Sequence, residues 1–282
     1  LGQTRASYDD AAESERWPIP MVLDVGASDG ELRQLLDAST TIELAHRPAF
    51  VQANVGGAGF YRVELDAELR LALLEHGDPG PLERFVLIDD TWAGYLAGRV
   101  QLTEVVQLLV GASATELDPS VWRRLAGACR ELVRLSGPDH AAAARALVAS
   151  VAVPALDRVE AAIDETAATA GTERGDRTER LREVRGVLFA LAGADAADPG
   201  TRRRARELFQ DSTVDATLQA AAIGVVAASA TAEEHAVLEA AWRDAATPQD
   251  ELRYLNALVD TDDPGLFAHT LELAATEVRT QN

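Results

Sequence analysis

The pattern of hydrophobic and polar residues changes near residue 66. Before that point, short apolar or alternating segments are separated by Gly, Asp and Ser. They are WPIPMVLDV at 17–25, TTIELA at 40–45, AFVQANV at 49–55 and FYRVELD at 60–66. Segments of this kind, bounded by turn-forming residues, predict β-strands. We therefore expect a small β domain over residues 1–66.

After Asp66 the hydrophobic positions follow a helical period to the end of the sequence. Five sites carry helix-start signals, in which a capping side chain precedes a proline or opens a capping box. They are Asp118-Pro119, Asp198-Pro199, Thr247-Pro248, Asp263-Pro264 and Thr231 with Glu234. Roughly eleven helices joined by short connections predict stacked antiparallel pairs. The fold class is therefore mainly α, with an α-solenoid (α-α superhelix) of the HEAT type over residues 67–282, although no strict repeat period is visible.

The net charge of −20 argues against nucleic acid and anionic membranes as partners, because both require a basic surface. The apolar runs near Leu147–Leu156 and Ala220–Ala230 reach only about half the ~20 residues of a membrane-spanning helix. A single cysteine, Cys129, excludes an intrachain disulfide and fits a reducing compartment. We expect a cytoplasmic protein.

The segment MVLDVGASDGELRQLL, residues 21–36, has two interpretations. As strand, glycine loop and helix, it resembles the start of an S-adenosylmethionine-dependent methyltransferase, with Glu43 holding the ribose. As a β-hairpin, Ser28, Asp29 and Gly30 form the turn, with Gly30 able to take a positive φ. The hairpin is favoured, because the alternating strands and helices that a methyltransferase needs do not follow.

A second glycine cluster lies in NVGGAGFYRVELD, residues 54–66. Its glycines suit a phosphate loop, but the Lys-Ser/Thr of a P-loop and a following helix start are missing. A tight turn into a strand is the simpler interpretation. The segment resembles the Asn…Gly-Tyr/Phe-Tyr-Arg-Val motif of the aminopeptidase N family of zinc metallopeptidases. In that family the motif lies in the last strands of a small β-sandwich that follows the catalytic domain.

The resemblance continues in order along the chain. Leu1–Arg5 and Trp17–Pro20 are similar to the opening strands of the sandwich, and Arg84–Leu109 to the first long helices. Asp250–Ala274 resembles a late helical repeat, and Glu277–Asn282 a segment before the family's final helices. The resemblance implies a small antiparallel β-sandwich over residues 1–66 before the solenoid. One departure is Leu65, where the family commonly has tyrosine.

The same resemblance implies which residues matter. Seven match family motifs, and we expect them to be structural: Asn54, Gly59, Tyr61, Arg62, Asp66, Asp89 and Asp90. Arg62 is interpreted as an ion-pairing residue that ties the sandwich to the helical domain, because its planar five-donor group suits carboxylates. A substrate contact is the less favoured role.

The chemistry of the family is absent from this sequence. That chemistry uses an H-E-x-x-H helix to hold zinc and activate water. None of the five histidines is followed by Glu, and the only methionine, Met21, precedes Val22, so the family's Met-Glu-Asn loop for the peptide amine is missing too. We expect no catalytic, cofactor-binding or metal-binding residue here, with zinc held by a catalytic domain upstream of Leu1. The chain is interpreted as a piece of a longer aminopeptidase, cut before its last helices.

The function implied by the resemblance is that of a lid. In this family the helical domain closes a chamber, gates peptide access and binds the distal part of long peptides. The expected partners are the catalytic domain of the parent chain and peptides. The alternatives are a free-standing α-solenoid scaffold for protein interactions and, remotely, a methyltransferase.

Three further groups of residues have a simple and a chemical interpretation. His235 and Glu239 have a metal-ligand spacing, but a solvated helix face is favoured because no third ligand is apparent. Cys129 with His140 suggests a thiol nucleophile, but an apolar helical run favours a buried, inert thiol. The run Arg202–Arg206 suggests a phosphate site, but the net charge favours an exposed helix face.

Overall fold

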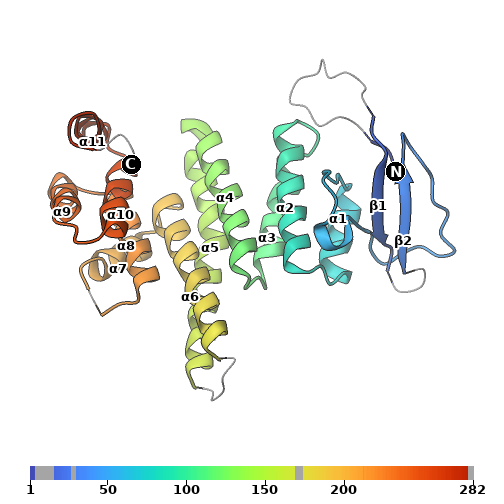
Figure 1. Ribbon diagram of the computed structural model, residues 1–282, viewed down its shortest axis with the longest axis horizontal. Coiled ribbons are helices and arrows are strands. Elements are labelled where there is room, and N and C mark those ends of the chain that lie inside the picture. Colours follow the sequence, from blue (N-terminus) through green and yellow to red (C-terminus); the bar gives the residue numbers. More distant parts are fainter. Residues whose placement is uncertain (4–15, 27–29, 169–173, 212, 279–282) are drawn as a thin grey trace. The chain divides into compact units, whose positions relative to one another are not determined.

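The computed structural model describes residues 1–3, 16–26, 30–168, 174–211 and 213–278. The chain divides into two compact units, Leu1–Ala128 and Cys129–Asn282, and the boundary falls within helix α4, Pro119–Leu135. Figure 1 shows the order of the elements, with strands at the N-terminal end and helices thereafter. The predicted division into domains at residue 66 concerned a different property, the change from strands to helices. It stays a prediction.

The first unit contains a three-stranded antiparallel sheet in the order β2-β1-β3. Its strands are β1, Ile19–Asp24; β2, Glu31–Leu36; and β3, Gln52–Ala53. Met21 and Leu23 alternate with less buried neighbours and pack with Leu36 in the core of the sheet. Asp24 pairs with Glu31, and Gly30 takes a φ of 64°. The predicted hairpin is confirmed, although Ser28 and Asp29 lie outside the described residues.

The methyltransferase interpretation is wrong. It required a helix from Glu31 and a parallel sheet, whereas Glu31–Leu36 is a strand and both neighbours of β1 run antiparallel to it.

Two predicted strands do not form. Residues 40–44 contain no strand; there Thr40 exchanges hydrogen bonds with Leu1, next to an isolated bridge between Gly2 and Ser39. Residues 60–66 form no strand; they begin with a bend, and the Val63 N–H donates to the side chain of Asp90. A tertiary contact has replaced a strand neighbour.

The rest of the described chain is helical, so the fold is mainly α with a small antiparallel sheet. A 3₁₀ turn, Val55–Gly57, precedes eleven described α-helices. They are α1 Ala67–His76, α2 Pro81–Leu96, α3 Leu102–Ser113, α4 Pro119–Leu135, α5 Gly137–Ala168, α6 Arg174–Ala190, α7 Pro199–Leu208, α8 Ala216–Ala228, α9 Ala232–Arg243, α10 Pro248–Val259 and α11 Pro264–Thr276. A π-helical turn, Leu191–Asp195, extends α6. Among the described helices, none has both the length and the apolar composition needed to cross a membrane.

All five predicted helix starts are confirmed. The side chains of Asp198, Thr247 and Asp263 each accept a hydrogen bond from a backbone N–H in the first turn, and Thr231 with Glu234 forms a capping box. Asp118 accepts from the N–H of Ser120 and Val121 at the start of α4. Each cap satisfies donors that a helix leaves unpaired, which explains why these helices begin where they do.

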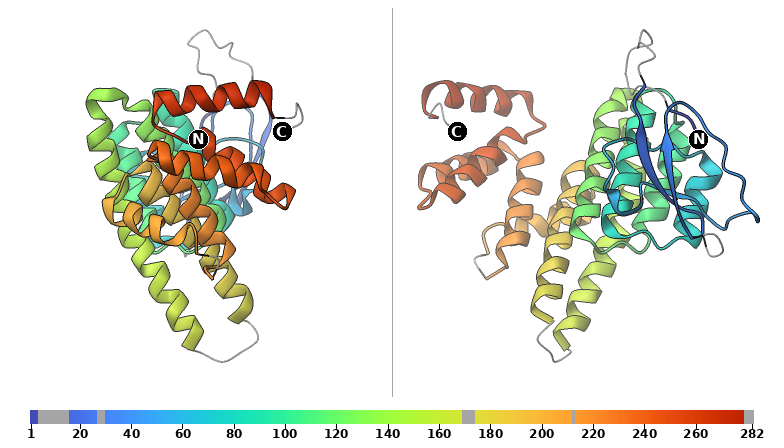
Figure 2. Two further views of the ribbon diagram at one scale, coloured as in Figure 1. Left: turned by 90° about the vertical axis from the view of Figure 1, so that its left-hand side faces the viewer. Right: turned by 45° about the vertical axis from the view of Figure 1, so that its right-hand side comes forward.

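In the second unit, helices pack in rows. Helix α5 packs along α6, α6 packs on α8, and α8 packs on α10. Helix α7 contacts α8, and helix α9 contacts both α8 and α10. Figure 2 shows α5 and α6 as a long antiparallel pair. This order of contacts is what a stack of helix pairs requires. The HEAT-type assignment itself stays a prediction.

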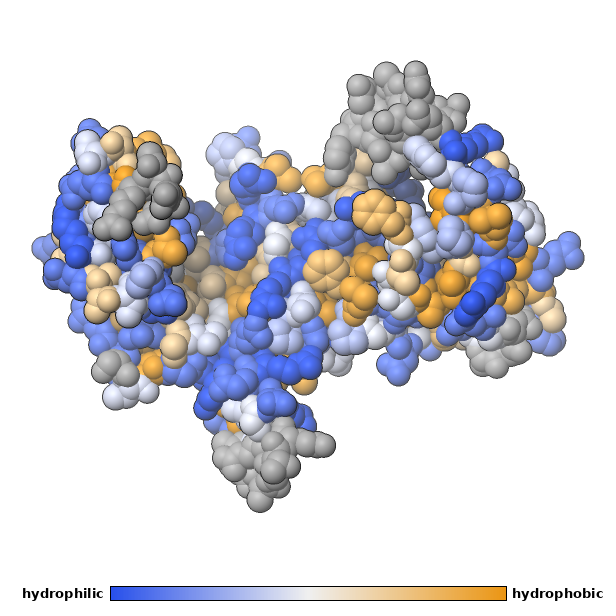
Figure 3. Space-filling model, viewed as in Figure 1, coloured by the Kyte–Doolittle hydropathy of each residue, from blue (hydrophilic) through white to orange (hydrophobic). Residues whose placement is uncertain are grey.

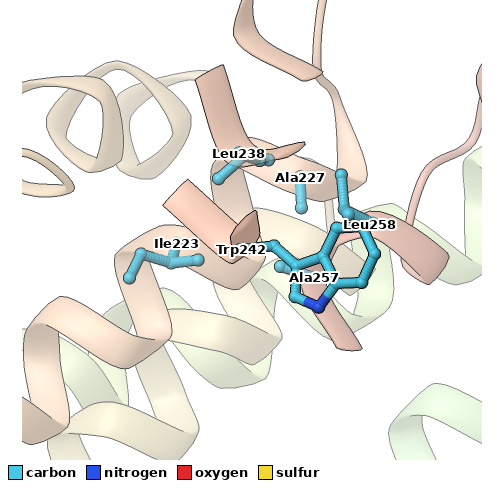
Figure 4. Packing of buried hydrophobic residues seen from close by; sticks show 6 residues of the cluster. All are labelled: Ile223, Ala227, Leu238, Trp242, Ala257 and Leu258. Carbon is cyan, nitrogen blue, oxygen red and sulfur yellow. The ribbon is translucent and has the colours of Figure 1, made fainter. Parts of the chain in front are cut away.

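One apolar cluster joins the last of these helices. It consists of six buried residues from α8, α9 and α10, shown in Figure 4: Ile223, Ala227, Leu238, Trp242, Ala257 and Leu258. Leu238 and Leu258 are fully buried. Because buried apolar area is the main stabilising contribution, this cluster fixes the three helices to one another.

The acidic stretch 162–180 is helical on both sides of residues 169–173, which lie outside the described residues. Helix α5 runs to Ala168 and α6 starts at Arg174. Figure 3 shows hydrophilic residues gathered at this end of the α5–α6 pair. The hydrophilic sequence therefore marks two exposed helix ends.

The π-helical turn provides a test of helix packing. A methyl group on Gly193 would lie 2.5 Å from the Val225 side chain of α8, whereas one on Gly224 would meet nothing within 4 Å. We expect Gly193→Ala to lower the free energy of unfolding by about 1–3 kcal/mol through overpacking. The control Gly224→Ala, also in a helix of this unit, is expected to raise it by roughly 0.5–1 kcal/mol. Urea unfolding followed by circular dichroism measures both, and equal effects would contradict the close packing of Gly193.

Candidate functional site

The seven motif residues all lie in the first unit. Asn54 ends β3 with a left-handed backbone, φ 60°, which Asn tolerates better than most residues. Its side chain accepts from the Gly59 N–H at 2.7 Å and donates to the Gly59 carbonyl at 3.2 Å. A Cβ on Gly59 would lie 2.1 Å from the Tyr61 ring, so only glycine fits. The two hydrogen bonds between the Asn54 side chain and the Gly59 backbone thus close the loop 54–59 of the motif.

Tyr61 places its ring against the core of the sheet, beside Met21, Leu23 and Leu36. Burial raises the pKa of its phenol above the ordinary value, and the Val22 backbone partly offsets this shift. Phe60, its neighbour, is fully exposed. The Tyr61 ring therefore packs on the sheet while the Phe60 ring lies in solvent, although the segment is not a strand.

Arg62 connects this segment to helix α2. Its Nη1 donates to Asp89 Oδ2 at 2.6 Å and to Asp90 Oδ1 at 3.0 Å. Asp89 also accepts from Arg124 Nε on α4 at 2.8 Å. Arg62, Asp89 and Arg124 thus form a row of alternating charge from the motif segment through α2 to α4. We call Arg62, Asp89, Asp90 and Arg124 the ion-pair clamp.

Asp90 is the buried member of the clamp, with 8% of its surface exposed. It accepts from the Val63 N–H at 2.8 Å and from Arg62. Burial raises the pKa of Asp90 from 3.8 to about 6, although both donors and the Arg62 charge act in the opposite direction. Burial also lowers the pKa of Arg62, but Asp89 and Asp90 together leave it above its ordinary value.

Asp66, the last residue of the segment 54–66, caps helix α1 by accepting from the Leu69 N–H at 2.8 Å. One turn further, the guanidinium of Arg70, buried to 4% exposure, donates to the Leu65 carbonyl at 2.6 Å. The motif thus ends by fixing the first helix against the segment that precedes it.

A cavity of about 780 Å³ adjoins the clamp. Strand β1 lines one side, with Trp17 and Pro18, and residues 58–64 line another. Its four charged side chains are already paired, Arg62 with Asp90 and Arg99 with Glu64. The volume lies in the range of small-ligand sites, but among the described residues of its lining the charges are paired with one another and do not select a ligand.

The described contacts of the seven residues join the segment 54–66 to the sheet and to helices α1 and α2. Among the residues that the structure describes, no three His, Cys, Asp or Glu side chains gather as a metal site requires. The structural role of the seven residues stays a prediction, which the first two experiments below address.

His235 and Glu239 do not share a solvated helix face; that interpretation is wrong. His235 is 2% exposed, and its Nε2 lies 3.1 Å from Thr270 Oγ1 on α11. Glu239 accepts from His269 Nε2 at 2.8 Å. Sequence reasoning missed these partners, because they lie about thirty residues away and the i, i+4 spacing says nothing about α11.

The other two groups divide. Cys129 is 1% exposed, as expected for a buried thiol, and His140 is exposed on α5. The run Arg202–Arg206 is not simply an exposed face. Arg204 pairs with Glu160 and lies over the Phe189 ring, and Arg206 pairs with Glu234 at 2.6 Å. These arginines tie neighbouring helices together.

Comparison with known proteins decides the family. The family model of the ERAP1-like C-terminal domain matches residues 50–282. The chain belongs to this family. The match begins four residues before Asn54, so it includes all seven motif residues and every described α-helix.

A relative in Caenorhabditis elegans supports the same assignment. It is a puromycin-sensitive aminopeptidase, 35% identical over 118 residues, which are 39% of this chain and 12% of that protein. The chain therefore spans only a small part of the curated relative it matches. Together the two findings confirm the resemblance to the C-terminal region of an aminopeptidase N family member.

The ion-pair clamp predicts an uneven cost of losing arginines. Arg62→Ala leaves the buried Asp90 with only the Val63 donor, so we expect a loss of about 1–2 kcal/mol in the free energy of unfolding, discounted because Arg62 is half exposed. Arg33→Ala removes an arginine that is 81% exposed and paired with Glu31, and should cost less than about 0.5 kcal/mol. Urea titration compares them, and equal losses would show that Arg62 has no structural role.

Asp90 predicts a pH dependence of stability. Its pKa of about 6 in the folded protein exceeds the ordinary 3.8, so the stability it contributes is present below about pH 4 and is lost as pH rises through 6. The wild-type free energy of unfolding, relative to that of Asp90→Asn, should fall by about 2–2.5 kcal/mol between pH 4 and pH 7. Asn keeps an acceptor for Val63 and cannot titrate. A difference that does not change with pH would contradict the raised pKa.

Proposed function

We propose that this chain is the C-terminal, non-catalytic part of a zinc-dependent aminopeptidase that removes N-terminal amino acids from peptides. In this proposal it caps the active-site chamber, gates the entry of peptides and binds the distal part of long ones. The match of residues 50–282 to the ERAP1-like C-terminal domain carries the proposal. The nematode relative is named an aminopeptidase, and from this name we expect the parent of this chain to be a peptidase.

The packing of the second unit supports a lid physically. Helices stacked in rows through α6, α8 and α10 form an extended surface, since small rotations between successive pairs add up. The net charge of −20 favours cationic groups, among them the free amine of a peptide. The proposed partners are accordingly the catalytic domain of the parent chain and peptides, with no nucleic acid and no membrane. A cytoplasmic location remains part of the proposal.

Zinc is proposed only for the catalytic domain. The described residues provide no cluster that fits the metal, and no histidine in the sequence starts an H-E-x-x-H motif. We therefore assign no reaction step to this chain, and we expect the purified chain alone not to hydrolyse an aminoacyl substrate. Its contribution to catalysis is the enclosure of substrate, which excludes water and commits the peptide.

The gating proposal predicts that the chain matters more for long peptides. A lid touches little of a dipeptide analogue but surrounds a decapeptide, so its binding energy appears with length. Deleting these 282 residues from the parent enzyme is expected to reduce kcat/KM for a decapeptide at least about tenfold more than for a dipeptide analogue.

The control is a thermal melt of the truncated enzyme, because removing a packed domain exposes apolar surface. A folded enzyme that loses activity equally on both substrates would reject gating and leave only structural support. A purified chain that instead binds other proteins and has no effect on the parent enzyme would favour the free-standing scaffold.

A further inference from the structure

Helix α11 is attached through a buried polar contact as well as apolar ones. His235 of α9 and Thr270 of α11 are each 2% exposed, and His235 Nε2 lies 3.1 Å from Thr270 Oγ1. Only two residues of α11, Thr270 and Leu273, are buried. One of the two buried residues of the helix therefore contacts a titratable ring.

The protons of this contact can be assigned. Thr270 Oγ1 also lies 3.0 Å from the Leu258 carbonyl of α10 and 3.1 Å from the Leu266 carbonyl of its own helix. Carbonyls only accept, so the hydroxyl proton goes to them, and its oxygen accepts from His235. With its proton on Nε2 the neutral ring donates to Thr270, and a second proton would go to Nδ1 of a residue that is only 2% exposed.

A second, exposed set of contacts lies beside the first. His269 of α11 binds Glu239 of α9 at 2.8 Å, and Arg243 of α9 binds Glu277, just after α11, at 3.1 Å. The rings of His235 and His269 are 6.0 Å apart. A proton on His269 strengthens its bond to Glu239, and its charge repels a proton on His235.

The charged groups around His235 come from two helices. Burial lowers the pKa of His235 below its ordinary 6.5 most strongly, and the charge of His269 lowers it further. The Leu258 carbonyl, Glu239 and Asp263 at the start of α11 act in the opposite direction but do not outweigh burial. Folding therefore favours the neutral ring, and the stability that it contributes is present above about pH 6.5 and is lost as pH falls through the lowered pKa.

We propose that His235 is an acid-sensitive latch, whose protonation releases helix α11 from helices α9 and α10. A charged ring cannot stay in the site between Thr270 and Leu258 without losing its hydration, so opening the helix is the lower-energy outcome. Val278, just after α11, packs against the apolar cluster of Figure 4, and release uncovers that side of the cluster. This device is independent of the proposed peptidase role.

The experiment is amide hydrogen exchange on the whole chain from pH 7.5 to 4.5, corrected for the intrinsic rate. The opening constant of α11 is expected to rise up to about tenfold for each pH unit below about 6.5, because opening takes up one proton. Amides of α6, in the same unit, should keep their protection. Loss of protection in all helices together, or no change in α11, would overturn the latch.

Three variants separate the trigger from the surrounding contacts. His235→Gln keeps an N–H that can reach Thr270 but does not titrate, and it should abolish the pH dependence of α11 opening. His269→Gln removes the charge beside Glu239 and also the charge that repels a proton on His235. It should therefore make α11 open more at every pH and keep the direction of the pH dependence, because His235 still titrates. His140→Gln, at an exposed site on α5, should behave as the wild type. If His235→Gln retains the wild-type pH dependence, His235 is not the trigger, and the wild-type comparison of α11 with α6 stands even if this variant fails to fold.

Discussion

The cost of burying the carboxylate of Asp90 governs the architecture of the first unit. A carboxylate with 8% exposure needs donors, and two groups of the motif segment supply them: the Val63 N–H and the guanidinium of Arg62. The segment that reads as a strand is thereby turned toward helix α2. Asn54 and Gly59 close the turn that aims it there. In the described structure, Asn54, Gly59 and Arg62 of the motif thus all lie on the segment that contacts Asp90.

Arginine side chains also hold poorly exposed carboxylates at other places in the structure. Arg84 holds the buried Glu116 with two donors at 2.6 and 3.1 Å, and Arg206 holds Glu234 while also donating to the Ser229 carbonyl. A planar group with several donors can satisfy a carboxylate and a carbonyl at once, which an ammonium group does less well. The sequence has no lysine, so its net charge of −20 is the balance of 26 arginines and 46 acidic residues.

The match to the ERAP1-like C-terminal domain assigns residues 50–282 to a family. The described residues offer apolar clusters, caps and ion pairs, and the matched region starts before the motif and runs through all the described helices. Features of this kind determine where surfaces lie. For that reason the proposed contribution to catalysis is enclosure of a substrate and not a reacting group.

Local signals in the sequence determined much of this structure. The hairpin at Gly30, the five helix starts and the change from strands to helices follow from backbone preferences and capping, which act over a few residues. Tertiary structure decided the rest. FYRVELD is not a strand because Asp90, twenty-seven residues after Val63, takes its N–H. His235 is buried against helix α11, where it contacts Thr270, a residue thirty-five positions further along the sequence. Such contacts depend on which helix faces come together, and a periodic pattern gives a residue's side of a helix but not the group that it meets.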